Sequence, residues 1–158
     1  MKKKTIISVI LILFFTAFCL SVNAQKDTPF EKDYFSSEQK DALKTATKQI
    51  KDGDKYYDAD IPVYSLAIEY FLKANDFNPN NALLNYKIGR CYIKTIQKTN
   101  SIKYLEHAYK LNPNVKPDIL YLLARGYHLN LELDKAITTF EEYRGTLTPN
   151  ELTKQGDK

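Results

Sequence analysis

Small and apolar residues recur at helical spacing in two stretches, residues 67–79 and 101–113, which align position by position at a shift of 34 residues. In each copy they fall at i, i+4 and i+7, so they share one face of a helix, and an Asn-Pro pair then stops the run. Residues 136–143 (AITTFEEY) repeat the Ala-x-x-x-Phe core one residue out of step. A fixed period of this length indicates helical units that stack on one another.

The same pattern predicts six helices and no strand. Ser36 begins the first helix, because Ser-x-x-Gln is a capping-box pattern. Pro62 suits the first turn of the second helix, and Gly145 is expected to end the sixth. The helices are expected at residues 36–57, 63–77, 82–98, 101–111, 117–131 and 134–143. Their lengths and short connections predict an all-α fold of antiparallel helix pairs.

The flanking segments divide the chain into four parts. Residues 37–147 form the predicted repeat domain, and residues 25–36 are a linker, because they mix charges with a proline and show no period. Residues 148–158 open with a capping-box pattern and predict the start of a capping or further helix. We expect that last helix to be incomplete, so that the natural protein, or a longer relative, continues past it.

Residues 1–24 have the composition of a secretory signal peptide. Three lysines precede an apolar core at residues 6–20, and Val22-Asn23-Ala24 offers the small residues that a signal peptidase reads, with cleavage before Gln25. The apolar core is short for a bilayer span of roughly 20 residues, although an uncleaved anchor helix is the alternative. We therefore expect an exported chain that is not inserted in a membrane after cleavage.

Cleavage changes the charge of the chain and its cysteine content. The signal peptide carries three of the 23 basic residues and none of the 19 acidic ones, so the formal net charge falls from +4 to about +1. Bulk attraction to nucleic acid or to a membrane surface then has no support. Cys91 is the one cysteine left, which excludes an internal disulfide, and its place in a helical pattern near Gly89 indicates a small buried hydrophobic residue.

These residues resemble the tetratricopeptide (TPR) repeat, whose pattern is Leu-Gly-x-x-Tyr in the first helix and Ala-x-x-x-Phe-x-x-Ala…Pro in the second. In the first repeat, Ile50 and Tyr57 fit only if one residue is inserted before Pro62, and Gly53 then falls one place early. In the third repeat, Tyr143 replaces the second alanine. The middle repeat matches best, through Ile88, Gly89, Tyr92, Ser101, Leu105, Ala108 and Pro113.

The resemblance covers roughly residues 47–150 and implies a short right-handed solenoid of about three repeats. Gly89 and Ala124 would let paired helices approach closely.

A more particular likeness exists to the N-terminal TPR segment of exported Bacteroidota proteins, in which a WD40-like propeller and an OmpA-like domain follow. This likeness rests on three features: the Asn-Ala-Gln at the end of the signal peptide, the many tyrosines and the segment YKIGRCYIKT. It implies a periplasmic or outer-membrane role, in some relatives within type IX secretion or gliding machinery.

Candidate catalytic and metal-binding residues are few. His128 and Glu132 stand at i, i+4 and could offer two metal ligands, but no third ligand is recognisable and a solvated surface pair is the favoured interpretation. The chain has no Gly-rich phosphate loop and no Ser-centred elbow. We expect neither a cofactor nor a metal, and we do not expect an enzyme.

Binding is the better class of function. In TPR arrays the first helices line a concave groove, and the resemblance places six residues of this chain in it, as well as Lys48, Lys51 and Lys55 of the poorly fitting first repeat. Aromatic and cationic side chains suit an acidic peptide, because arginine grips carboxylate with two parallel hydrogen bonds. The alternative is that they are ordinary exposed helix residues. The six predicted groove residues are Tyr86, Arg90, Lys94, Tyr121, Arg125 and His128.

Two hypotheses follow for the function. The first is an exported adaptor that binds an extended, acidic segment of a protein partner in its groove. The second is a non-catalytic spacer module within a longer OmpA-like envelope, secretion or gliding protein. Nothing in the sequence separates them.

Overall fold

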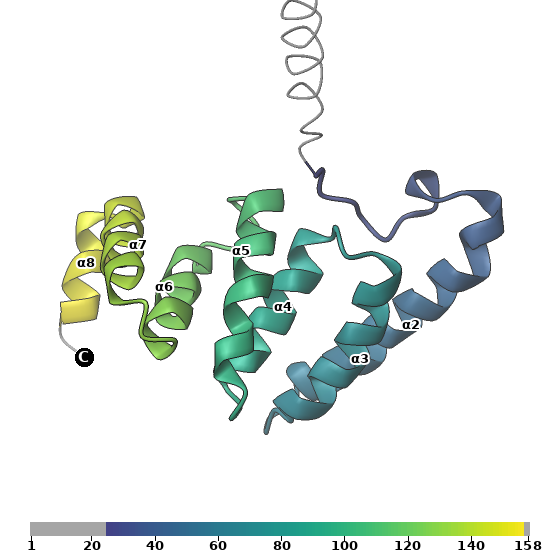
Figure 1. The fold of residues 1–158 in the computed structure, drawn as a ribbon, viewed down its shortest axis with the longest axis horizontal. Coiled ribbons are helices and arrows are strands. Elements are labelled where there is room, and N and C mark those ends of the chain that lie inside the picture. Colours follow the sequence, from purple (N-terminus) through teal and green to yellow (C-terminus); the bar gives the residue numbers. More distant parts are fainter. Residues whose placement is uncertain (1–24, 157–158) are drawn as a thin grey trace, which may run out of the picture.

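The computed structural model describes residues 25–156, which form seven α-helices and three 3₁₀ turns, with no β-strand among them (Figure 1). The predicted signal peptide lies outside these residues. No helix within residues 25–156 has the length and apolar character needed to cross a membrane. The elements are η1 (Lys32–Tyr34), η2 (Ser37–Gln39), α2 (Lys40–Tyr57), α3 (Tyr64–Phe77), α4 (Ala82–Ile93), η3 (Lys98–Asn100), α5 (Ser101–Leu111), α6 (Ile119–Leu129), α7 (Leu133–Thr146) and α8 (Pro149–Gly156).

Six helices form three consecutive pairs that stack in chain order (Figure 1). Within the pairs α2 packs on α3, α4 on α5 and α6 on α7, and contacts of α3 with α4 and of α5 with α6 join the pairs. The predicted all-α fold of stacked helix pairs is therefore confirmed. Two hydrophobic clusters run through the stack, one centred on Phe71 and Ile88 and the other on Leu105 and Leu123.

The close approach of α4 and α5 depends on Gly89, as the sequence predicts. A Cβ atom at this position would lie 2.5 Å from Cγ of the fully buried Leu105. Gly53 has the same relation to α3, because a Cβ atom there would lie 2.6 Å from the ring of Phe71. Each glycine thus makes room for one large side chain of the paired helix.

This equivalence corrects the predicted register of the first repeat. Tyr56 stacks on Tyr70 with ring centroids 5.7 Å apart, just as Tyr92 stacks on Tyr104 at 5.6 Å. The structural counterpart of Tyr92 is therefore Tyr56 and not Tyr57. The first repeat has two extra residues instead of one, and Gly53 is then in step with Gly89. The extra residues lie in the connection between α2 and α3, so neither helix is distorted.

Two predicted helix ends are wrong. The third helix ends at Ile93 and not near residue 98, because the Lys94 and Thr95 amides bond three residues back and the Thr95 hydroxyl also donates to Tyr92 O. Gly145 lies inside α7, which ends at Thr146. No glycine among the described residues has positive φ, so Gly145 does not form the left-handed cap that was expected of it.

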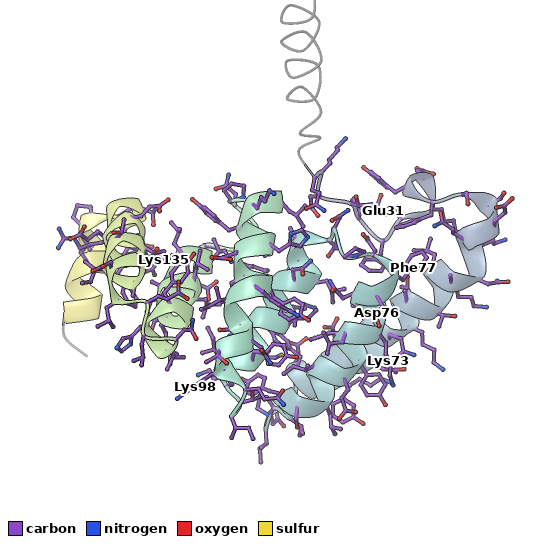
Figure 2. All side chains as sticks on the ribbon, in the orientation of Figure 1. Glu31, Lys73, Asp76, Phe77, Lys98 and Lys135 are labelled. Atoms are coloured by element: carbon purple, nitrogen blue, oxygen red, sulfur yellow. The ribbon has the colours of Figure 1, made fainter. Side chains whose placement is uncertain are left out.

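The segment that the sequence predicts as a linker is attached to the first repeat. Thr28 donates its amide to Asn80 O at 2.8 Å, and its own carbonyl accepts hydrogen bonds from the side chains of Asn78 and Asn81. Phe35 packs on Phe77 with ring centroids 4.9 Å apart, and Phe77 lies at the end of α3, on the side of the stack where Glu31 of this segment lies (Figure 2). This segment, residues 25–35, is called the leader strap below. It then leads into the capping box of Ser36 and Gln39, which the structure confirms.

The last pair of the stack leaves an apolar position open. Ile68 and Ile102 occupy the same place in the second helices of the first two pairs and are 7% and 9% exposed, because the next pair covers them. Ile137 is their counterpart in α7 and is 57% exposed. Beyond α7, the carboxylate of Glu151 accepts a hydrogen bond from the Thr148 amide at 2.9 Å, as the second predicted capping box requires, and α8 begins there.

Candidate functional site

The first helices of the three pairs carry the residues that the sequence singles out. We call the surface formed by Tyr57 on α2, Arg90 on α4, and Tyr121, Arg125 and His128 on α6 the first-helix face. Its composition is aromatic and cationic, as predicted. The contacts within it show which of these side chains are available to a ligand.

Arg90 is held by α2. Its Nη1 donates to the Tyr57 hydroxyl at 3.0 Å, and its guanidinium carbon lies 5.6 Å from the centroid of the same ring. The side chain is exposed and makes no ion pair with any described residue. Because a guanidinium has five N–H donors, most of them remain free after the bond to Tyr57. Arg90 is thus fixed in place and still able to bind a carboxylate.

Arg125 has a similar support on the next pair. Its guanidinium carbon lies 5.9 Å from the centroid of the Tyr121 ring, and the same ring contacts Phe140 and Tyr143 at 6.0 and 5.6 Å. Tyr121 is 38% exposed, so part of its ring faces solvent. Arg125 also makes no ion pair with a described residue. Two arginines at equivalent repeat positions therefore each rest near a tyrosine ring.

Tyr86 is not the exposed groove residue that the repeat position predicts. It is 2% exposed, and its hydroxyl donates to Asp118 Oδ1 at 2.7 Å. This bond joins α4 to the start of α6, so Tyr86 fixes the angle between two pairs instead of contacting a ligand. Its predicted counterpart Tyr121 is exposed, because no further pair follows α6 and α7 in the described stack.

The remaining predicted residues have no partners on this face. Lys94 caps the end of α4, and His128 lies in the last turn of α6; both are exposed. Among the described residues neither side chain makes a hydrogen bond or an ion pair. His128 and Glu132 do not share a helix face, which corrects that expectation. Leu131 has φ of 63°, α6 has already ended at Leu129, and Glu132 is the cap of α7, where it pairs with Lys135.

Lys48, Lys51 and Lys55 were placed in the groove through the wrong register. The residues of α2 that contact the first helix of the next pair are Asp54, which pairs with Lys87 Nζ at 2.6 Å, and Tyr57. Neither residue is predicted in this role from the sequence. With two inserted residues in place of one they fall on the groove positions, so the spacing of Gly53 to Gly89 could have found them.

The local environment favours the charged form of Arg90 and the neutral forms of Tyr57 and Tyr86. Burial lowers the pKa of Arg90 on its own, but the Tyr57 and Tyr86 hydroxyls and the Asp118 carboxylate favour the charged form more, and the pKa is raised overall. Burial raises the pKa of Tyr57 to about 12. Burial and the bond to Asp118 raise the pKa of Tyr86 as well. At neutral pH the face therefore carries cationic arginines beside neutral phenols.

The face has no obvious means of covalent chemistry. Within the described residues no group of three His, Cys, Asp or Glu side chains could hold a metal ion. Cys91 is fully buried, and burial raises the pKa of its thiol to about 12, so it is not a thiolate nucleophile near neutral pH. The arrangement can bind and position a carboxylate, which is recognition chemistry.

Comparison with known families identifies the repeat. Residues 82–115, which span α4, α5 and their connection, match the tetratricopeptide repeat. No curated protein matches the chain significantly. The chain thus contains a TPR repeat in its middle pair, and the pairs on either side repeat its geometry at Gly53 and Ala136. Such repeats are generally non-catalytic scaffolds that bind other proteins.

Proposed function

We propose that the protein is an exported TPR scaffold of the cell envelope that binds an extended, acidic segment of a protein partner on its first-helix face. The observation that carries this proposal is the repeated arginine support. Arg90 and Arg125 occupy the same repeat position on neighbouring first helices, and each rests near a tyrosine ring without an ion pair among the described residues. Arg90 is also held by its hydrogen bond to Tyr57, so this side chain loses less conformational entropy on binding.

The spacing of this pair suits an extended chain. Neighbouring helices pack roughly 8–10 Å apart, and a peptide in the polyproline II conformation advances about 3.1 Å per residue with three residues per turn, so side chains three residues apart point the same way. Carboxylates three residues apart would therefore meet both arginines. The signal-peptide pattern of residues 1–24 supports export, and the Bacteroidota-like phrase in residues 86–95 supports an envelope location.

A second candidate function is a spacer module in a longer envelope assembly. The exposure of Ile137, whose counterparts Ile68 and Ile102 are buried, favours it, because the last pair presents an apolar position that another helix pair would cover. In that case the stack holds neighbouring domains of the assembly at a fixed distance, and the first-helix face has no ligand of its own.

Direct titration distinguishes the two. A fluorescein-labelled peptide with acidic residues three apart is titrated with the wild-type chain and with Arg90→Glu/Arg125→Glu, and anisotropy is measured. Charge-assisted hydrogen bonds contribute about 1.5–3 kcal/mol each, so the proposal predicts a loss of affinity of at least tenfold for the double reversal. Lys98→Glu/Arg144→Glu carries the same change of charge on exposed residues outside the face and should bind like wild type.

Further measurements separate a loss of binding from a loss of folding. Thermal unfolding of each variant shows whether the fold survives, and Arg90→Gln/Arg125→Gln repeats the test without placing new carboxylates near Asp118. A pull-down from envelope extract then compares wild type with both arginine variants. Equal peptide affinity and an unchanged set of captured proteins in all variants would exclude the first-helix face and leave the spacer function.

A further inference from the structure

A row of lysines runs along one side of α2, outside the first-helix face. Spaced at 100° per residue, the five members fall within an arc of about 80°. All five are exposed, whereas the core-facing Leu43, Ala46 and Gly53 are buried on another side of the helix. Asp41 and Asp52 flank the row. This row, which we call the basic stripe, consists of Lys40, Lys44, Lys48, Lys51 and Lys55.

Most of this charge is not neutralised within the described protein. Lys55 pairs with Asp52 at 2.7 Å, and the other four lysines make no ion pair with any described residue. Asp54, the next carboxylate along α2, is already bound to Lys87. Asp52 also lies within electrostatic range of Lys48 and Lys51, so its one negative charge is shared among three of the five lysines. The row is therefore a net cationic track about 22 Å long, from the helical rise of 1.5 Å per residue.

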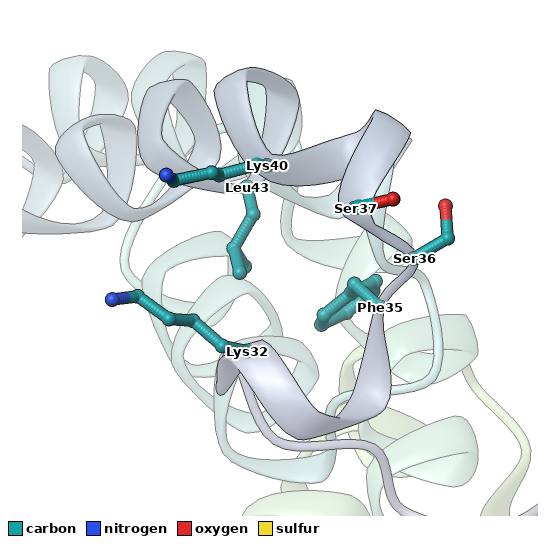
Figure 3. Close-up of a pocket in the computed structure, with 6 residues that line it drawn as sticks. All are labelled: Lys32, Phe35, Ser36, Ser37, Lys40 and Leu43. Carbon is teal, nitrogen blue, oxygen red and sulfur yellow. The ribbon is translucent and has the colours of Figure 1, made fainter.

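A cleft opens at the N-terminal end of the stripe, between α2 and the leader strap. It has a volume of about 570 Å³ and is lined by Phe30, Leu43, Thr47, Lys32, Lys40, Lys44 and the single acid Asp41. A recess of about 100 Å³ adjoins it, and the ring of Phe35 lies there opposite Lys40 (Figure 3). In that view Lys32 and Lys40 reach toward the same side from facing segments, with Leu43 between them. The cleft thus combines an apolar floor with a cationic rim.

We infer that the basic stripe and this cleft form a second binding site, for an extended acidic peptide that inserts one apolar side chain between α2 and the leader strap. Lys40, Lys44 and Lys48 are four residues apart, which is about 6 Å along the helix. Alternate side chains of an extended peptide are about 6.6 Å apart and point the same way. Acidic residues at alternate positions therefore match the stripe, and about seven residues span it.

The shape of the site favours a peptide over a membrane surface. The apolar floor lies between α2 and the leader strap. A single apolar side chain can enter this space, whereas a flat bilayer surface cannot. The charges continue in one direction from the cleft along a single helix, which suits a linear ligand. The site goes beyond the proposed function, because it lies on different residues and binds its ligand whether or not Arg90 and Arg125 bind one.

The test uses a probe peptide of about eight residues with glutamate at alternate positions and one terminal tryptophan. The protein contains no tryptophan, so all indole fluorescence comes from the probe. Titration with the purified chain should give a saturable blue shift as the indole enters the cleft. Lys40→Glu/Lys44→Glu should weaken binding by about tenfold or more, since each reversal replaces attraction by repulsion. A probe with glycine in place of tryptophan should also bind more weakly, as followed by its competition with the tryptophan probe.

The matched control is Lys98→Glu/Arg144→Glu, which has the same change of charge on exposed residues; Lys98 lies at the opposite edge of the stack from Glu31 of the leader strap in Figure 2. This control should bind the probe like wild type. Equal weakening in the control and the stripe variant would show bulk electrostatics and would overturn the inference. So would unchanged affinity in the stripe variant when its melting temperature is unchanged.

A third titration uses vesicles of phosphatidylglycerol and phosphatidylcholine. Vesicle binding that is lost in Lys40→Glu/Lys44→Glu, together with no binding of the peptide probe, would assign the stripe to a membrane surface and overturn the peptide site. Peptide binding without vesicle binding supports it. The stripe variant is tested with the tryptophan peptide and the arginine variant with the fluorescein peptide. The two binding sites can therefore be confirmed or rejected independently.

Discussion

Gly89 and Leu105 share one small space between α4 and α5: a Cβ atom on the glycine would lie 2.5 Å from Leu105 Cγ and 3.2 Å from the Leu105 amide nitrogen. Leu105 is fully buried and cannot move aside without displacing its neighbours. The absence of a side chain at Gly89 therefore sets the distance between the two helices of the middle pair.

Gly89→Ala should destabilise the protein by about 1–3 kcal/mol, because the new methyl group overpacks this contact. Gly145→Ala is the matched control: that glycine lies in α7, and a Cβ atom there would meet nothing within 4 Å. In a helix, alanine is favoured over glycine by roughly 0.5–1 kcal/mol, so this variant should be more stable. Urea unfolding followed by circular dichroism measures both. Equal effects in the two variants would contradict the packing that we describe.

The bond between Tyr86 and Asp118 gives a second prediction. Tyr86→Phe leaves a carboxylate without its donor at the junction of α4 and α6, and should cost about 1 kcal/mol. Asp118→Asn should cost less, because an amide oxygen still accepts the hydroxyl. A double-mutant cycle with Asp118→Ala should give a coupling energy of roughly 0.5–1.5 kcal/mol. Additive effects would mean that the two side chains do not interact in solution.

The sequence predicted the two helices of the middle repeat, apart from the end of α4 and the burial of Tyr86. The 34-residue match between 67–79 and 101–113 predicted both ends of α5, because an Asn-Pro pair stops the run. Asn81 caps α4, accepting a hydrogen bond from the Leu84 amide at 2.9 Å. Local chemistry of this kind can be read from the chain without knowledge of its neighbours.

The parts that could not be predicted depend on contacts between elements. Tyr56 and Tyr57 are adjacent, and the stack of Tyr56 on Tyr70 shows which of them fills the repeat position, as the spacing of Gly53 to Gly89 also indicates. Tyr86 sits at a groove position but is buried, because Asp118 of the following pair bonds to it. The leader strap has no periodicity, and its place depends on hydrogen bonds to residues about 50 positions away. The predicted register of α2 was therefore wrong, whereas the binding role of Arg90 and Arg125 stays a prediction.

Stability should fall in alkaline solution before the arginines lose their charge. Burial raises the pKa of Tyr57 from its ordinary value of 10.0 to about 12, so the folded state favours the neutral phenol. The contribution to stability is complete below pH 10 and is lost as the pH rises through 12. The urea midpoint should decline over this window, and Tyr57→Phe should decline less steeply. Identical pH profiles for the two proteins would show that Tyr57 is not among the groups whose titration lowers the stability.

The open position at the last pair predicts unequal effects for equivalent isoleucines. Ile102→Ala removes a buried side chain and should cost about 2–5 kcal/mol. Ile137→Ala changes a side chain that is 57% exposed and should stay within about 0.5 kcal/mol. Unfolding of both variants is measured at two protein concentrations. A large, concentration-dependent loss for Ile137→Ala would show that another copy of the chain covers this position.

The attachment of the leader strap can be tested at one hydrogen bond. Asp27 Oδ1 accepts from the Ala82 amide at 2.9 Å, which places a carboxylate at the N-terminus of α4, where the free amides and the helix dipole both favour negative charge. Asp27→Ala should therefore cost about 1 kcal/mol, as loss of a helix cap does. Asp33→Ala removes the same side chain from an exposed position in η1 of the same strap and should be neutral. Amide hydrogen exchange adds a local measure, because the Ala82 amide should lose protection in Asp27→Ala and keep it in Asp33→Ala. If both variants unfold like wild type and protect Ala82 equally, the strap is not held at α4 in solution, and the cleft that it forms with α2 is not held closed either.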